Sequence, residues 1–237
     1  MISKERIKYI RTLHQKKFRD QHHQFIIEGA KLLEEALMYA PQSIQQIYST
    51  EELPFKSGLP INIISEKELS QISMLQHPQK IIAVCDYLPI HQKRPDFYVV
   101  LDTIQDPGNL GTILRLCSWF GVFYILSSKE SVDIYNPKVV QASMGAIFNV
   151  QIEYCDLKEE LKQITLPIYG ALLEGENIYT VPKERKGVLV MGNEGNGIHT
   201  DLLSFISHPI TIPKFGKGES LNVAMATAIL LSEFSRK

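Results

Sequence analysis

The sequence predicts an α/β protein with a mostly parallel sheet in its C-terminal part and a smaller α/β unit before it. From residue 97 onward, short apolar, β-branched segments alternate with segments of helical periodicity. Buried strands separated by helices are typical of a parallel sheet that helices cover on both faces. A polar stretch bracketed by prolines precedes this region, so we expect two domains.

We expect residues 1–88 to form the small domain, 89–96 the linker and 97–237 the larger domain. Apolar residues at helical spacing predict helices, and β-branched runs predict strands. In the first domain the expected helices are 7–17, 30–39 and 66–72, and the expected strands are 25–28, 44–49, 61–64 and 81–85. In the second domain the expected strands are 97–101, 122–126, 147–152, 168–172, 188–191 and 209–212. The helices expected between them are 108–120, 137–144, 157–164, 200–206 and 220–234.

Composition argues against several classes of protein. No apolar run is long enough to span a membrane, and the N-terminus lacks an apolar signal segment, so we expect a cytoplasmic protein. Cys85, Cys117 and Cys155 are widely spaced without a Cys-x-x-Cys pair, which argues against a zinc site or a disulfide framework. No set of carboxylates or histidines has the spacing of a metal site, so no metal is expected.

Positive charge is concentrated at the N-terminus. The whole chain has a formal net charge of −1, whereas residues 1–24 carry seven Lys/Arg and two Asp/Glu, a net charge of +5. Such a segment can follow the phosphate backbone of a nucleic acid. The alternative is a helix face that water solvates. The candidate phosphate contacts are Lys4, Arg6, Arg11, Lys16, Lys17 and Arg19.

Three segments that follow expected strands contain the candidate site residues. The first passes from Leu101 through a Pro-Gly turn into a helix. Asn109 can cap that helix with its amide directed outward, and Gly111 permits close approach of a partner. Arg115 interrupts an otherwise apolar helix, which favours binding of a phosphate or carboxylate. An ion pair with an acid such as Asp106 is the alternative.

The second segment, Val188–Ile198, ends a buried strand in a glycine-rich turn. Its glycines do not have the spacing of the dinucleotide-binding fingerprint. Glu194 at the tip of the strand could bond a ribose hydroxyl, orient a base, or hold Arg115 or a backbone amine. The alternative is a tight turn with a solvated carboxylate.

The third segment, Ile212–Ala224, has the pattern of a strand end, a glycine-hinged loop and the start of a helix. Ser220 is expected to cap that helix, while Gly216 and Gly218 let the backbone approach a ligand. No Ser or Thr directly follows Lys217, so the segment is not a Walker A loop.

The residues after Ser220 add ligand-binding groups to this loop. Leu221, Asn222 and Ala224 offer an apolar contact, an amide and a gap. This combination suits a flat ligand with polar edges, such as a nucleoside held against the backbone.

In their order, the three segments resemble the three motifs of the SpoU/TrmH family, the RNA ribose 2′-O-methyltransferases of the SPOUT class. Residues 136–146 resemble the segment that this family has between its first two motifs, although Gln141 stands where many relatives have Arg. The basic N-terminus and Phe25–Gly29 resemble the family's substrate-binding domain, which has a ribosomal-protein-like fold. The resemblance spans nearly the whole chain.

The resemblance implies a catalytic domain with a deep trefoil knot, S-adenosylmethionine bound in the knot, and a homodimer formed by the catalytic domains. It implies RNA as the substrate, with ribosomal RNA preferred over transfer RNA. The implied cofactor contacts are Gly192, Glu194, Ile212, Leu221, Asn222 and Ala224. The implied reacting site consists of Asn109, Arg115, Glu194, Ser220 and Asn222.

The implied reaction is attack of a ribose 2′-oxygen on the methyl group of the cofactor. The family proposal makes Arg115 a general base, but arginine keeps its proton at neutral pH because its pKa exceeds about 12. Our hypothesis is that Arg115 orients the ribose-phosphate and stabilises the developing alkoxide. Three alternatives stay open: a SPOUT-type methyltransferase that acts on a base nitrogen, a non-catalytic RNA-binding protein, and an enzyme that binds small nucleotides.

Overall fold

Two compact units make up the chain in the computed structural model, in which residues 2–53, 55, 57–90 and 93–236 are described. The first unit comprises Met1–Pro89 and Asp133–Asn149; the second comprises Ile90–Val132 and Val150–Lys237. The division after Pro89 falls in the expected linker 89–96, of which 91–92 lie outside the described residues. The grouping of 133–149 with the N-terminal unit was not predicted from the sequence.

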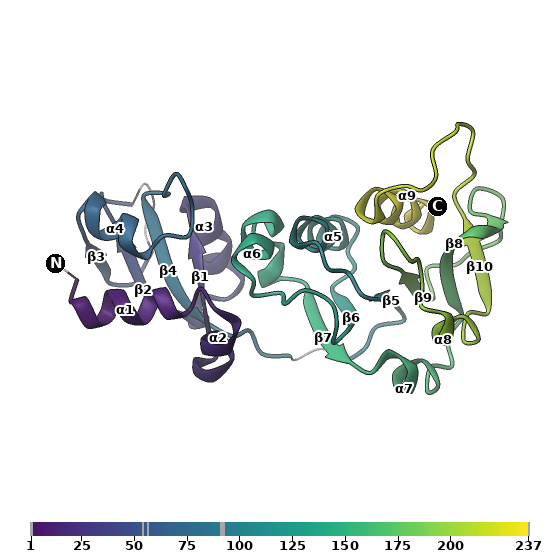
Figure 1. Ribbon diagram of the computed structural model, residues 1–237, viewed down its shortest axis with the longest axis horizontal. Coiled ribbons are helices and arrows are strands. Elements are labelled where there is room, and N and C mark those ends of the chain that lie inside the picture. The colour runs from purple at the N-terminus through teal and green to yellow at the C-terminus, as the bar shows by residue number, and fades with distance from the viewer. Residues whose placement is uncertain (1, 54, 56, 91–92, 237) are drawn as a thin grey trace. The chain divides into compact units, whose positions relative to one another are not determined.

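The first unit contains a four-stranded sheet in the order β1-β4-β2-β3 (Figure 1). β4 is antiparallel to β1 and β2, whereas β2 and β3 are parallel. The strands follow the predicted β-branched runs and are β1 (Gln24–Glu28), β2 (Ile44–Ser49), β3 (Ile61–Ile63) and β4 (Ile81–Asp86).

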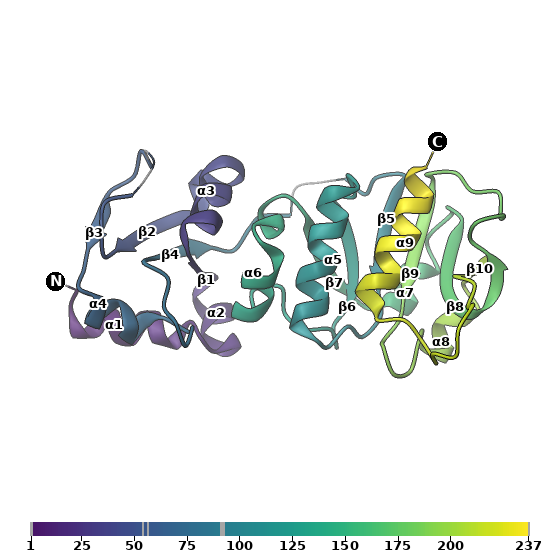
Figure 2. The same cartoon turned by 90° about the horizontal axis from the view of Figure 1, so that it is seen from above.

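Helices cover both faces of this sheet. α1 (Lys4–Thr12) and α4 (Glu66–Ile72) lie side by side and share a core with alternate strand residues such as Ile26 and Ile82 (Figure 2). α3 (Ala30–Tyr39) packs against β1 and β4.

The expected single helix 7–17 is two helices in the structure. α1 ends at Thr12, Gln15 is extended, and α2 (Lys16–His22) follows. Ser3 caps α1, and its side-chain oxygen accepts a hydrogen bond from the Arg6 backbone N–H. The sequence predicted a single helix because Leu13, which lies beyond the end of α1, is buried in the same core as Ile10 and continues its apolar spacing.

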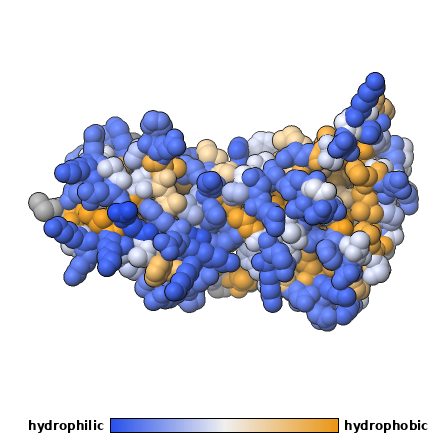
Figure 3. All heavy atoms as spheres, viewed as in Figure 1, coloured by the Kyte–Doolittle hydropathy of each residue, from blue (hydrophilic) through white to orange (hydrophobic). Residues whose placement is uncertain are grey.

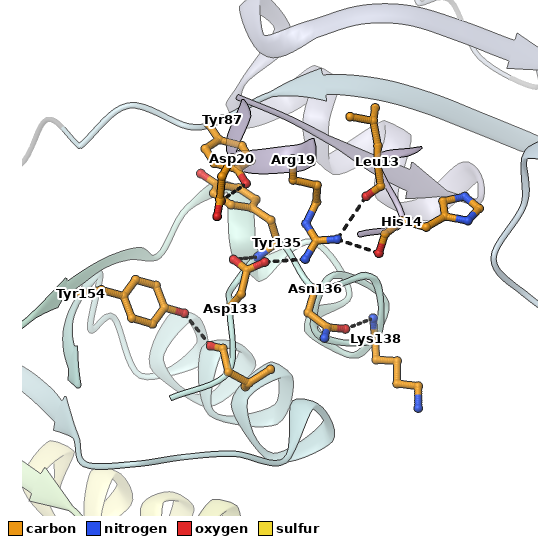
Figure 4. A network of polar contacts seen from close by, with 11 residues as sticks. Leu13, His14, Arg19, Asp20, Tyr87, Asp133, Tyr135, Asn136, Lys138 and Tyr154 are labelled. Carbon is orange, nitrogen blue, oxygen red and sulfur yellow. Dashed lines mark hydrogen bonds and ion pairs between the residues drawn. The ribbon is translucent and has the colours of Figure 1, made fainter. Parts of the chain in front are cut away.

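The segment 133–149 packs into the first unit through aromatic rings and a buried ion pair. The Tyr135 ring lies 4.7 Å from the Phe25 ring and 3.9 Å from the Tyr87 ring, centroid to centroid. Arg19 donates to Asp133 at 2.6 Å (Figure 4). α6 (Pro137–Ser143) contacts β1, so this segment belongs to the same core as the strand.

The second unit contains a six-stranded sheet in the order β10-β8-β9-β5-β6-β7. Every pairing in it is parallel, which confirms the predicted α/β class with a parallel sheet. The strands are β5 (Phe97–Leu101), β6 (Tyr124–Ser128), β7 (Gln151–Cys155), β8 (Ile168–Asn177), β9 (Gly187–Met191) and β10 (His208–Thr211).

Two helix layers enclose this sheet (Figures 1 and 2). On one face α5 (Pro107–Trp119) packs against α9 (Val223–Ser235). On the other face α7 (Leu157–Leu161) and α8 (Thr200–Leu203) share a core with the strands. No helix in the described ranges is long and apolar enough to cross a membrane.

Several boundaries differ from the sequence prediction, and two strands show the largest differences. The expected strand 147–152 is a 3₁₀ turn at Ala146–Phe148 followed by β7, because Phe148 packs near the Phe25 ring of the first unit. β8 continues to Asn177 instead of ending at 172. Its register against β10 shifts between Pro209 and Ile210, so residues 171–175 have no partner in β10 and bulge from the ladder.

Candidate active site

The loops that follow β5 and β9 are joined by a buried carboxylate. Asp102 is 4% exposed, and its Oδ2 accepts the backbone N–H of His199 at 2.7 Å. Its Oδ1 accepts the Thr103 hydroxyl at 2.9 Å. Asp102 therefore ties the end of β5 to the far end of the glycine-rich turn.

Asn193 holds the start of the same turn. Its side-chain Nδ2 donates to the Thr103 carbonyl at 2.9 Å, and its Oδ1 accepts the Gly195 N–H at 2.9 Å. A Cβ at position 192 would collide with the backbone of Gly197 and Ile198. Only glycine fits at Gly192, because the turn folds back directly over it.

A chain of side-chain hydrogen bonds connects the three predicted segments. Asn109 Nδ2 donates to Glu194 Oε1, and Asn109 Oδ1 accepts Asn222 Nδ2 at 2.9 Å. Asn222 Oδ1 in turn accepts the backbone N–H groups of Ala224 (3.0 Å) and Met225 (3.3 Å). Both amides are thereby fixed in orientation, and the direction of donation runs from α9 toward Glu194.

The helix caps differ from those predicted. Asp106, not Asn109, caps α5 by accepting the Asn109 N–H at 2.8 Å. Asn222, not Ser220, caps α9, so that helix begins at Val223. Because backbone capping at α5 falls to Asp106, the Asn109 side chain is available to bridge Asn222 and Glu194.

A cavity of about 1070 Å³ opens at this edge of the sheet. Turn 191–198, the end of β10 with the loop after it, and the bulged residues 171–174 form its walls. Five predicted site residues line it: Gly192, Glu194, Ile212, Ser220 and Leu221. Asn109, Arg115, Asn222 and Ala224 do not line it. Ala224 is buried at 2% exposure, and Asn222 is joined to the site by its hydrogen bond to Asn109.

Arg115 is exposed on α5. It forms no ion pair among the described residues, so the alternative of a pair with Asp106 receives no support. The guanidinium is thus free to bind an anion from solvent.

The predicted basic residues divide into three groups. Arg19 is 2% exposed and bonds Asp133 and the carbonyls of Leu13 and His14 (Figure 4), so its predicted contact with RNA is corrected to a structural ion pair. Arg6 donates to the Tyr48 hydroxyl at 3.0 Å and lies over the Tyr9 ring. Exposed side chains remain at Lys4, Arg11, Lys16 and Lys17.

Sequence reasoning missed several residues that shape the site. Asp102 and Asn193 were overlooked, although an acid directly after a buried strand is a recognisable signal. The bulge at 171–174 left no signal, since its register depends on pairing with β10, far along the chain.

Neither metal ligation nor thiol chemistry is indicated. No group of three or more His, Cys, Asp or Glu side chains within the described ranges could hold a metal ion. The three cysteines are free, and burial raises the pKa of the Cys117 thiol to about 12. Such a thiol stays protonated and unreactive at neutral pH.

An open parallel sheet with a cavity outside the carboxyl ends of its strands is typical of ligand-binding α/β proteins. Within that class, residues 96–232 match the model of the SpoU rRNA Methylase family, and residues 4–83 match the MRM3-like substrate binding domain. The chain therefore belongs to the SpoU rRNA methylase family, which confirms the resemblance seen in the three motifs.

Individual relatives agree over nearly the full length. The chain is 34% identical over 236 residues to the 23S rRNA (guanosine(2553)-2′-O)-methyltransferase RlmP of Bacillus subtilis, covering 96% of this chain and 94% of that protein. A TrmH-family protein of Porphyromonas gingivalis is 35% identical with a TM-score of 0.88, covering 99% and 98% of the two chains. An AdoMet-bound rRNA methyltransferase from Sinorhizobium meliloti is 30% identical with a TM-score of 0.86, covering 99% and 95%.

Proposed function

We propose that this protein transfers the methyl group of S-adenosylmethionine to a ribose 2′-hydroxyl of RNA, with ribosomal RNA preferred over transfer RNA. The observation that carries the proposal is the hydrogen-bonded chain Asn222–Asn109–Glu194 at the edge of the cavity. It brings all three family motifs together at one place. The 2′-O-methyltransferase named among the relatives supports the same reaction.

The cavity fits a nucleoside bound largely by backbone. The absence of a side chain at Gly192 allows the backbone of Gly197 and Ile198 to approach it closely. The cavity volume of about 1070 Å³ is near the upper end of the size usual for small-molecule sites. Ile212 and Leu221 contribute apolar side chains to its wall. S-adenosylmethionine bound there would supply a methyl group on a positively charged sulfur.

The side chains at the rim position and activate the ribose. Glu194 Oε1 is occupied by Asn109, and its carboxylate lines the cavity where a hydroxyl or amine can donate to it. Arg115 would hold the phosphate beside the ribose and stabilise the alkoxide that develops as the 2′-oxygen attacks, while the hydroxyl proton passes to water and the cofactor leaves as a neutral sulfide. Alignment of the two reactants supplies the rest of the acceleration.

Substitution of Arg115 tests this mechanism. We expect Arg115→Ala to lower kcat by about 100-fold, the size of effect typical for loss of one charge-stabilising group, with S-adenosylmethionine affinity unchanged. Arg115→Lys should recover only part of the rate, because Lys cannot form the bidentate contact. The measurement is tritiated methyl transfer to total RNA with mapping of ribose methylation. Near wild-type rates for Arg115→Ala would contradict both the stabiliser and the general-base roles of Arg115. A methylated base with unmodified ribose in the product would identify an enzyme that acts on a base nitrogen.

The N-terminal unit is proposed to hold the RNA. Lys4, Lys8 and Arg11 recur at helical spacing along α1 and line a groove with His14. Lys16 and Lys17 add exposed charge on α2. The match to a substrate-binding domain supports this assignment.

Charge reversal at these positions gives a second prediction. The triple variant Lys8→Glu, Lys16→Glu and Lys17→Glu should weaken RNA binding at least ten-fold at low salt and flatten the slope of log Kd against log salt, because fewer counterions are released. Lys129→Glu, Lys162→Glu and Lys186→Glu together, at exposed positions in the second unit, reverse the same number of charges and are the matched control. An unchanged slope in the triple variant would refute the assignment.

Further properties are proposed from the family resemblance. The C-terminal chain crosses from β10 at the sheet edge to α9 beside α5, a path compatible with the deep trefoil knot. A homodimer through the second unit is supported by apolar side chains exposed on α5 and α9, with Trp119 84% and Met225 55% exposed. We also propose a ribosomal-protein-like fold for the N-terminal unit and a cytoplasmic location.

A further inference from the structure

The loop between β10 and α9 is largely exposed to solvent. It projects from the second unit in Figure 1, and Figure 3 shows hydrophilic residues at its tip. Residues 213–221 form no hydrogen bond or ion pair with any described residue. The polar groups of this loop are therefore available to a ligand, as is usual for binding loops.

Phe215 is the most exposed large apolar side chain in this loop, at 94%. Gly216 and Gly218 follow, and a Cβ at either would meet nothing within 4 Å. Nothing described in the chain covers the ring, so both of its faces are open. A phenyl ring held in water gains stability when a flat apolar surface stacks on it.

The charges beside the ring are mainly positive. Lys214 and Lys217 are exposed and form no ion pair in the described ranges, and Glu219 is the one acid between Pro213 and Ser220. An aromatic ring between two lysines matches a nucleobase between two phosphates.

The position of the Phe215 ring favours a nucleobase over two other occupants, a group bound deep in the cavity and a second copy of the chain. The cavity's inner wall is formed by less exposed residues such as Gly192 and Ile212, whereas Phe215 stands at the rim facing solvent. A group deep in the cavity would therefore leave the ring uncovered. A second copy of the chain would have to bury both lysines, which is unfavourable without acidic partners.

We propose that Phe215 stacks on a nucleobase of the substrate RNA at the mouth of the cavity, with Lys214 and Lys217 contacting the adjoining phosphates. This inference rests on the proposed function, since it describes how the second reactant is held at the same site. Phe215 would then be a specificity-determining residue for an unpaired nucleotide next to the modified ribose.

Substitutions at Phe215 separate stacking from simple apolar contact. We expect Phe215→Ala and Phe215→Leu each to raise the KM for total RNA about ten-fold, which corresponds to about 1.4 kcal/mol of stacking. Phe215→Tyr should behave like the wild type. S-adenosylmethionine affinity without RNA, measured by calorimetry, and the sedimentation coefficient should not change in any of these variants.

A spectroscopic test does not depend on catalysis. In a Trp119→Phe background, Phe215→Trp introduces a tryptophan as the sole indole of the chain. A single-stranded oligoadenylate should quench its fluorescence, and the same oligomer with abasic riboses should not.

Each other outcome identifies a different occupant and overturns the proposal. Loss of S-adenosylmethionine affinity in Phe215→Ala would assign the ring to the cofactor, and a changed sedimentation coefficient would assign it to a second copy. Equal RNA affinity for all variants would show that the ring is unused. The proposed function fails separately, if the wild-type protein methylates no ribose while quenching is still observed.

Discussion

At the scale of single residues, the site depends on groups whose sequence signals differ in strength. Asn109, Glu194 and Asn222 belong to recognisable motifs, and the structure joins them by hydrogen bonds. Asp102 is signalled only by its place directly after a buried strand, yet its buried carboxylate holds the glycine-rich turn in place. The glycines also differ, because backbone crowds Gly192 whereas open space surrounds Gly216.

This difference between glycines gives a prediction. Gly192→Ala should lower the free energy of unfolding by about 1–3 kcal/mol through overpacking, and should abolish S-adenosylmethionine binding because the turn must shift. Gly216→Ala, whose Cβ meets nothing within 4 Å, should leave the free energy of unfolding unchanged. Urea denaturation and calorimetry measure the two effects. Equal stability of both variants would show that the turn at Gly192 can relax without cost.

At the scale of elements, caps and tertiary packing decide where helices begin and end. The predicted helix 7–17 divides at Gln15, and α9 begins three residues later than predicted because Asn222 caps it. Helix α1 is also held by His14, whose Nε2 lies 3.0 Å from the Ile72 carbonyl oxygen at the end of α4. Burial lowers the pKa of His14, the bond to Ile72 partly opposes this, and Arg11 and Arg19 lower it further.

A pH dependence follows for this element. The folded-state pKa of His14 lies below its ordinary value of 6.5, so the unfolded chain binds the proton more readily. The free energy of unfolding should therefore fall as pH decreases below about 6.5, and His14→Gln should remove this part of the decrease. Urea unfolding at pH 7.5 and 5.5 checks it, with the exposed His77→Gln as control. A wild-type-like pH dependence in His14→Gln would contradict the assignment.

At the scale of the whole molecule, chain order and packing order differ. Residues 133–149 lie between β6 and β7 in sequence but pack with the N-terminal unit. Phe25 of β1 lies against Tyr135 and Phe148, and Arg19 is neutralised by Asp133. The first unit is therefore incomplete without a segment taken from the middle of the larger predicted domain.

Fragments of the chain test this dependence. Residues 1–89 alone should unfold without cooperativity and bind a hydrophobic dye, because Phe25 loses its aromatic partners and Arg19 loses Asp133. Removing one partner of a buried ion pair costs about 3–5 kcal/mol. Joining 133–149 to this fragment through a Gly-Ser linker should restore a cooperative transition. If the fragment 1–89 melts as sharply as the linked form, the segment is not part of its core.

The sequence by itself determined the α/β class, most strand positions and the three motifs, because these depend on local periodicity and on short runs of functional residues. It could not determine that Arg19 is buried, that 133–149 completes the first unit, or that Ala171–Glu174 wall the cavity. Those features arise from contacts between residues far apart in the chain, such as Asp133 with Arg19 and β8 with β10. Tertiary structure also gave the Asn222 cap a second contact, because its Nδ2 donates to Asn109 while its Oδ1 caps α9.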